Sequence, residues 1–285
     1  MQVFDYDKAF SRNIGWIGET EQSTLRRKRV AIAGMGGVGG FHLLALTRLG
    51  VGNFNIADLD IFEIENFNRQ VGASMGSIGR AKVEVLAGMA SDINPEVDLK
   101  LFSQGVDADN LDDFFRDVDL YVDGLDFFAF EAREKVFAHC AALGIPAVTV
   151  APLGISAALL NFLPGRMTFE EYFQIDGHHE LEKAVRFLVG LAPALLHRHY
   201  LADKSRVNLQ EKRGPSTIMA CQLCAGVAAS EAFKILLERG KVWAAPHGIQ
   251  YDGYRNKFAH TWRPGGNLNP INRLAITIAK KQLGI

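Results

Sequence analysis

The residue types best suited to bind phosphate lie in a glycine-rich loop and the segment that follows it. The loop GMGGVGG at 34–40 comes directly after an apolar run and opens a segment with helical periodicity. Glycines permit a tight turn there, and a phosphate can then approach the backbone N–H groups at the helix N-terminus. The candidate nucleotide contacts in this loop are Gly34, Gly36, Gly37 and Gly39.

A carboxylate stands at the end of the next predicted strand. Asp58 occupies the place where, in dinucleotide-binding folds, a carboxylate accepts hydrogen bonds from the ribose hydroxyl groups. The glycine loop and Asp58 together fit NAD and ATP equally well. They therefore leave hydride transfer and nucleotidyl transfer both open.

A charged segment after Asp58 favours nucleotidyl transfer. The stretch DLDIFEIENFNRQ at 58–70 and GRAK at 79–82 supply an amide, a guanidinium and an ammonium group just beyond a strand end. A carboxylate that attacks an α-phosphate builds charge on the phosphoryl oxygens, which cations and a metal ion stabilise. Each cation alone is equally well explained as a solvated surface charge. The candidate residues here are Asp60, Asn66, Arg69, Gln70 and Lys82.

Two acids follow the fourth predicted strand. Mg²⁺ prefers one or two carboxylates together with phosphate oxygens and water, so Asp123 and Asp126 are candidate ligands. Asp126 also precedes a helical run and would suit a helix N-cap. From the residues alone, both interpretations stay open.

The first half of the chain alternates short apolar or β-branched runs with segments of helical periodicity. This alternation predicts an α/β fold with a Rossmann-like, doubly wound, mostly parallel sheet and helices on both faces. Strands are expected at 29–33, 54–58, 97–102, 120–122 and 147–151. Helices are expected at 38–49, 80–93, 109–115 and 129–143.

After Pro152 the pattern changes. A strand predicted at 155–163 follows with no room for a crossover helix, so antiparallel strands should extend the sheet. We expect a helical stretch at 181–200, a charged crossover loop at 202–216 and a helix rich in small residues at 217–239. Strands at 248–252 and 256–261 and a basic tail helix at 270–283 complete the chain.

Length and composition limit the domain organisation. The chain has 285 residues, 48% of them hydrophobic, which is enough for one large core and excludes a disordered protein. We expect a single domain over 1–285. Its parts are an N-terminal helical arm (1–27), a nucleotide-binding half (28–152), a mixed-sheet and crossover half (153–263) and a C-terminal tail helix (264–285).

Charge and cysteine content predict a cytoplasmic protein. The 31 Lys and Arg balance 32 Asp and Glu, so no bulk charge attracts nucleic acid or an anionic membrane. Three cysteines are too few for a disulfide scaffold and indicate a reducing compartment. Acids near the N-terminus argue against a signal peptide, and the apolar runs are too short or interrupted to span a bilayer.

The sequence resembles the ThiF, MoeB and HesA family of adenylyltransferases, which are similar to ubiquitin-activating enzymes. The matching pattern runs from Arg12 through the glycine loop, the 58–70 block, Lys82, INP at 93–95 and the acids at 123–126. The resemblance implies a homodimer that uses ATP and Mg²⁺ to activate a carboxylate as an acyl-adenylate and releases pyrophosphate. In this family the carboxylate is often the C-terminus of a ubiquitin-like or sulfur-carrier protein, although a small carboxylate also fits.

The resemblance also assigns roles to residues. It places the glycine loop and Asp58 on the adenosine, and Asn66, Arg69 and Lys82 on the phosphates. It places Asp126 on Mg²⁺. It makes Arg12 a catalytic arginine from the other subunit, a trans finger of the kind that neutralises transferred phosphates. From the residues alone, Arg12 is only an exposed charge near the N-terminus.

The chain departs from the family pattern in two places. Asp126 is followed by Phe127, where the family commonly has asparagine, so a contact made by that amide is lost or replaced. Only one CxxC pair is present, Cys221 and Cys224, and two thiolates do not close a tetrahedral zinc site. We expect these two thiols to pack in the core.

Three alternatives remain. An NAD-dependent oxidoreductase would use the glycine loop and Asp58 but not the charged cluster. A non-catalytic nucleotide-binding partner protein would fit the change at Phe127. A tRNA-modifying adenylating dehydratase of the same superfamily would need a basic patch. The candidates for that patch are Arg206, Lys212, Arg213, Lys280 and Lys281.

Overall fold

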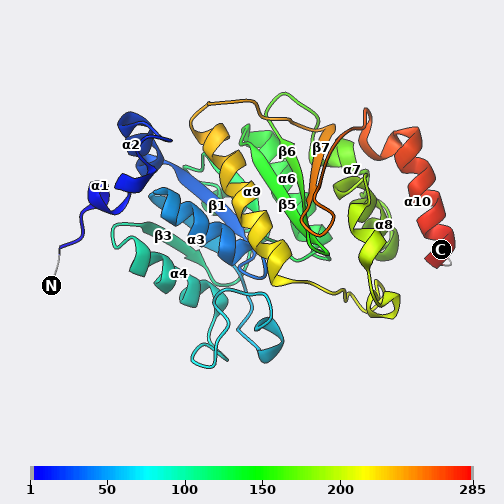
Figure 1. The fold of residues 1–285 in the computed structure, drawn as a ribbon, viewed down its shortest axis with the longest axis horizontal. Coiled ribbons are helices and arrows are strands. Elements are labelled where there is room, and N and C mark those ends of the chain that lie inside the picture. Colours follow the sequence, from blue (N-terminus) through cyan, green and yellow to red (C-terminus); the bar gives the residue numbers. More distant parts are fainter. Residues whose placement is uncertain (1–2, 284–285) are drawn as a thin grey trace.

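One mixed sheet organises the chain (Figure 1). The computed structural model describes residues 3–283, apart from the side chain of Lys204. Eight strands lie in the order β3-β2-β1-β4-β5-β6-β7-β8. They are β1 (Arg29–Ala33), β2 (Asn53–Ala57), β3 (Asp98–Phe102), β4 (Leu120–Asp123), β5 (Ala147–Leu153), β6 (Ser156–Phe162), β7 (His247–Asp252) and β8 (Lys257–Trp262).

The sheet changes direction where the sequence loses its crossover helices. Strands β1 to β5 are parallel, whereas β5–β6, β6–β7 and β7–β8 are antiparallel. The reversal occurs in a tight turn between Leu153 and Ser156, where Gly154 has φ +68°. The predicted fold class, a mostly parallel doubly wound sheet extended by antiparallel strands, is confirmed.

Helices cover both faces of the sheet. One core cluster gathers residues of α3 (Gly39–Leu49), α4 (Lys82–Ile93) and α9 (Ile218–Leu236) against the sheet, and Figure 1 shows these three helices on the near side. A second cluster gathers α5 (Leu111–Phe114), α6 (Phe130–Leu143), α7 (Phe169–Phe173) and α8 (Glu180–Leu191) on the other face. The tail helix α10 (Pro270–Leu283) packs against α8.

The small-residue helix α9 packs centrally, as its composition predicts. Within residues 3–283 it is the one helix long and apolar enough to cross a membrane by length and composition. Here most of its buried side chains, including Ala228 and Ala232, belong to the core cluster shared with the sheet and α3.

The prediction for the second half needs two corrections. The single helix expected at 181–200 is wrong: α8 ends at Leu191, and a separate 3₁₀ turn, η3, spans Leu196–Tyr200. Pro193 causes the break, because proline has no N–H to donate and its predecessor avoids the helical region. Helix α7 was missed, although Thr168 and Glu171 form a capping box at its start.

The N-terminal arm docks on the end of α3 that lies away from the glycine loop. It contains α1 (Tyr6–Ala9), η1 (Ser11–Asn13) and α2 (Glu19–Arg27). The Tyr6 hydroxyl donates to the carbonyl of Gly50, and the amides of Asn13 and Gln22 donate to the carbonyl of Leu49 at 3.2 and 3.0 Å. The first two residues of the predicted arm and the last two of the predicted tail lie outside the described residues.

Candidate functional site

Two loops at the C-terminal ends of the parallel strands touch through their backbones. Gly34 follows β1 with φ +88°, and a Cβ there would lie 2.2 Å from the carbonyl oxygen of Gly124, which follows β4. A Cβ on Gly39 would lie 1.7 Å from the carbonyl oxygen of Gly34. Only glycine fits these contacts, so the loop is a backbone cradle at the N-terminus of α3.

Asp58, the residue directly after β2, holds this cradle in place. Its carboxylate accepts hydrogen bonds from the backbone N–H of Met35 and, at 2.8 Å, from that of Asp60. Burial raises the pKa of the Asp58 carboxyl, and these hydrogen bonds oppose that effect by stabilising the charged form. The carboxylate predicted to meet the ribose therefore also fixes the shape of the loop.

Lys82 is held at the start of α4 by Asp60. Its side chain is only 7% exposed, and Nζ lies 2.9 Å from the Asp60 carboxylate. The backbone N–H of Lys82 also donates to the carbonyl of Asp60, at 3.0 Å. Asp60, predicted as a nucleotide contact, thus anchors the ammonium group next to the Asp58 brace.

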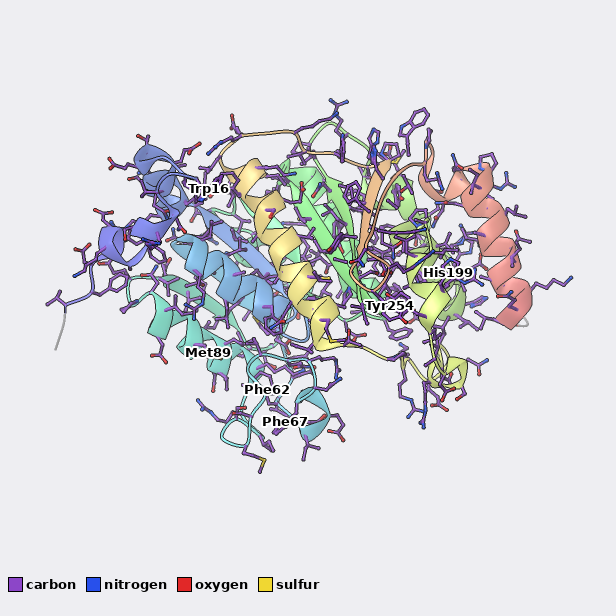
Figure 2. All side chains as sticks on the ribbon, in the orientation of Figure 1. Trp16, Phe62, Phe67, Met89, His199 and Tyr254 are labelled. Carbon is purple, nitrogen blue, oxygen red and sulfur yellow. The ribbon has the colours of Figure 1, made fainter. Side chains whose placement is uncertain are left out.

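The segment 59–81 projects beyond the C-terminal ends of the parallel strands, and Figure 2 shows Phe62 and Phe67 on it. Its middle part lies beside the cradle, because the stem of Arg69 lies 3.8 Å from the place of a Cβ on Gly37. The Arg69 guanidinium donates to the carbonyl of Glu65 at 2.9 Å. The aliphatic stem of a second cationic residue therefore lies beside the glycine loop.

Two amide side chains complete this part of the site. Gln70 is buried with its nitrogen 3.8 Å from the place of a Cβ on Gly36, and its Oε1 has no hydrogen-bond partner in the described part of the chain. A buried acceptor without a partner beside the cradle fits a site that receives a ligand. Asn66 is also buried, but its Oδ1 accepts from the backbone N–H of Glu63 and so shapes the local turn.

The two acids after β4 have different environments. Asp123 is buried and accepts from Arg133 Nε and Thr149 Oγ1, both at 2.9 Å, and from the backbone N–H of Leu125 at 3.1 Å. Both oxygens of its carboxylate accept hydrogen bonds from protein groups. The interpretation of Asp123 as a metal ligand is therefore wrong.

The Asp126 side chain is exposed and, among residues 3–283, accepts a single hydrogen bond, from the backbone N–H of Phe128 at 2.9 Å. It does not cap α6, whose N-cap residue is Ala129. Within residues 3–283, no group of three His, Cys, Asp or Glu side chains could hold a metal ion. One free carboxylate still fits Mg²⁺, because that ion takes most of its ligands from phosphate and water.

Arg12 lies apart from the other predicted residues. It is exposed on η1, and within residues 3–283 its side chain has no hydrogen-bond or ion-pair partner. The neighbouring Asn13 fixes η1 to Leu49, at the opposite end of α3 from the cradle. One chain alone does not bring Arg12 to its own glycine loop.

Some residues that anchor the crossover beside the site were not predicted, because they belong to no recognisable motif in the sequence. Both ends of the crossover are tied to the β5–β6 turn: Thr217 Oγ1 donates to the carbonyl of Gly154 at 2.7 Å, and Ile155 N–H donates to the Tyr200 hydroxyl at 2.8 Å. The 2.9 Å contact of Tyr200 with Asp252 adds β7 to this anchor. Nothing in their local sequence pairs these residues.

The cysteines of the CxxC pair are fully buried in the core cluster, as the packing interpretation predicts. Burial raises the pKa of both thiols. The Sγ of Cys221 lies 3.3 Å from the place of a Cβ on Gly37, so this thiol packs against the glycine loop.

The arrangement of cradle, brace and cations agrees with comparisons to known proteins. The sequence model of the ThiF family matches residues 10–268, which is most of the chain. The chain belongs to the ThiF family. This identification confirms the resemblance inferred from the glycine loop and the charged segment after it.

Individual ThiF-family relatives match over shorter stretches. The chain is 33% identical over 141 residues to the tRNA threonylcarbamoyladenosine dehydratase of Bacillus subtilis, covering 49% of this chain and 55% of that protein. It is 30% identical over 143 residues to the sulfur carrier protein ThiS adenylyltransferase of Escherichia coli, covering 50% and 56%. The chain thus spans about half the length of these two relatives.

The fold matches a solved structure more widely. The structure of Escherichia coli MccB with ATP superposes with a TM-score of 0.66 at 19% identity, covering 89% of this chain and 70% of that one. At this identity the likeness concerns the fold.

Proposed function

We propose that the protein is an ATP- and Mg²⁺-dependent adenylyltransferase that activates a carboxylate as an acyl-adenylate and releases pyrophosphate. The observation that carries the proposal is a chain of contacts that joins three charged groups to one cradle. Lys82 is paired with Asp60, the stem of Arg69 lies beside Gly37, and Asp126 lies in the loop whose Gly124 contacts Gly34. Hydride transfer has no use for such a cluster, which argues against the oxidoreductase alternative.

Each group has a defined part in the proposed reaction. The N–H groups of the cradle and the N-terminus of α3 bind phosphate oxygens. A carboxylate oxygen of the substrate attacks the α-phosphorus, the bond to the β-phosphate oxygen breaks, and pyrophosphate leaves. Arg69 and Lys82 stabilise the charge that builds up on the phosphoryl oxygens. Asp126 would hold Mg²⁺, which supplies further charge neutralisation when bound.

For the substrate, we favour the C-terminal carboxylate of a small ubiquitin-like or sulfur-carrier protein. The name of the ThiS adenylyltransferase supports this class. The tRNA alternative rests on the Bacillus relative and on a basic patch. Here Arg206, Lys212 and Arg213 pair with acids within 3.4 Å, as does Lys280, so the candidate patch is largely neutralised.

We further propose that the single domain works as a homodimer in the cytoplasm. Arg12 needs a second chain to reach a cradle, and several large apolar side chains around it and on the projecting segment are exposed. They are Ile14, Trp16, Leu59, Ile61, Ile64, Phe67, Met75 and Ile78. Figure 2 shows Trp16 on the arm and Phe67 on the projecting segment. A partner subunit would cover such side chains.

ATP–pyrophosphate exchange tests the proposed activity. Exchange that depends on one added carboxylate would identify both the reaction and the substrate. Lys82→Ala and Arg69→Ala should each lower exchange by about 10²-fold, the scale for losing one preorganised charge partner. Lys28→Ala is the matched control, because Lys28 pairs with Asp119 at the other end of β1.

Two outcomes would contradict the proposal. A wild-type protein that binds ATP but shows no pyrophosphate exchange with any added carboxylate would support the non-catalytic alternative. Equal exchange by the Lys82→Ala and Lys28→Ala proteins, both folded, would remove Lys82 from the reaction.

A further inference from the structure

A buried arginine links the end of β4 to the loop that carries Asp126. Arg133 lies in the first turn of α6, and its side chain is only 2% exposed. Nε donates to the Asp123 carboxylate at 2.9 Å. One terminal nitrogen donates to the carbonyls of Leu125 and Asp126 at 2.8 and 2.9 Å, and the other to that of Phe127 at 3.3 Å. One guanidinium thus binds three consecutive peptide carbonyls.

Arginine is the only side chain that can make these contacts together. Its planar group carries five N–H donors in a fixed arrangement, whereas the lysine ammonium is a compact charge with three. A lysine could keep the ion pair with Asp123 but not the bonds to all three carbonyls. The loop conformation from 125 to 127 therefore depends on the shape of the guanidinium and not only on its charge.

An aromatic side chain from the second half of the chain covers this cluster. The Arg133 guanidinium lies 4.7 Å from the centre of the Phe187 ring on α8, and Phe127 packs on the same ring at 5.3 Å. Phe127 stands where the family commonly has asparagine. Here it closes the cluster against water, which strengthens the hydrogen bonds beneath it.

The same cluster sets the position of the cradle. Asp123 receives a second side-chain bond from Thr149 on β5, and the next residue, Gly124, is the one in backbone contact with Gly34. A shift of the loop would therefore move the Asp126 carboxylate and the floor of the glycine loop together.

We propose that Arg133 is a positioning residue: by fixing the 124–127 loop, it sets the orientation of Asp126 toward a cation and so the cation requirement of nucleotidyl transfer. This inference rests on the proposed function. It assigns no contact with substrate to Arg133, which acts through Asp126 and Gly124.

The test compares conservative substitutions at two buried arginines, which lie at opposite ends of the parallel strands. Arg133→Lys should raise the Mg²⁺ concentration for half-maximal pyrophosphate exchange by about tenfold, the scale for losing an outer partner of a metal ligand. Arg29→Lys is the control, because Arg29 pairs with Asp98 and Asn55 at the start of β1. It should lower thermal stability and leave the Mg²⁺ requirement unchanged.

A second measurement does not depend on turnover. Amide hydrogen exchange of the peptide covering 124–129 should be faster in the Arg133→Lys protein and unchanged in the Arg29→Lys protein. If Arg133→Lys does not fold, Thr149→Val removes a single hydrogen bond to Asp123 and should shift both measurements in the same direction by a smaller amount.

The outcomes separate this inference from the proposed function. Absence of exchange in the wild-type protein would overturn the function, whereas the hydrogen-exchange comparison would still test the loop. An Arg133→Lys protein with wild-type Mg²⁺ requirement and wild-type protection of 124–129 would overturn the positioning role. Equal shifts in the Arg29→Lys protein would do the same, because they would show general loss of stability.

Discussion

Arg12 should act only on the cradle of a second subunit. The cradle lies at the N-terminus of α3, and the arm that carries Arg12 is fixed to Leu49 at the other end of the same helix. Helix α3 has 11 residues, which at the usual rise per residue separates its two ends by about 15 Å. One side chain on η1 does not cover that distance, so a contact within one chain is excluded by the geometry.

The experiment places two inactivating substitutions, Arg12→Ala and Lys82→Ala, on different chains of one dimer. Arg12→Ala and Lys82→Ala should each lower pyrophosphate exchange by about 10²-fold or more. In a mixed dimer, one site combines the intact Lys82 of one chain with the intact Arg12 of the other, and the second site has both defects. Random subunit exchange makes about half of the dimers mixed, so activity should recover to about a quarter of the wild-type value for a two-fold dimer with independent sites.

The assay is exchange measured on equal mixtures after subunit mixing. Mixing is verified by mass spectrometry on chains of different isotope content. The control mixture pairs Arg12→Ala with wild-type chains and reports whether mixing itself changes activity. If confirmed mixed dimers show no more activity than the two single variants, Arg12 does not act in trans, and the α3 distance argument is refuted.

Three other predictions concern the cation, the cradle and pH. Asp126→Asn should lose exchange activity and regain part of it at high Mg²⁺; a loss that is insensitive to Mg²⁺ would leave Asp126 only its turn-capping bond. Gly34→Ala should lower the unfolding free energy in urea by about 3 kcal/mol or more, because its Cβ would lie 2.2 Å from the oxygen of Gly124. Gly79→Ala, with φ +77° and open space, should cost only about 1 to 2 kcal/mol, and equal losses would refute the clash. Burial lowers the pKa of His42 to about 4, and neither ring nitrogen has a hydrogen-bond partner among residues 3–283. Near pH 6 the His42 imidazole is protonated only in the unfolded chain. The free energy of unfolding should therefore be highest above about pH 6.5 and fall by up to about 3 kcal/mol toward pH 4. His42→Leu should abolish this pH dependence.

The local sequence predicted the elements and the position of the cradle. The strand expected at 29–33 and the tail helix at 270–283 have those bounds in the structure, and the others differ by a few residues. These predictions succeed because apolar periodicity and proline or glycine boundaries act over a few neighbouring residues. The stretch at 181–200 failed because its periodicity continued past Pro193, and the local stop signal was outweighed.

The roles of individual charged side chains depended on contacts between distant segments. Asp123 and Asp126 are indistinguishable as acids after a strand, yet one is bound by Arg133 and Thr149 and the other is exposed. Arg12 is close to the glycine loop in sequence, but the arm folds to the far end of α3.

The sequence by itself thus determined the fold class, the family and the place of the glycine cradle, because backbone conformation and apolar patterning are local properties. Only the tertiary structure decided which carboxylate is free, which cation is anchored and which side chains shape the loops. The physical reason is that burial and hydrogen-bond partners set the state of a charged group, and both come from segments that meet only when the chain folds.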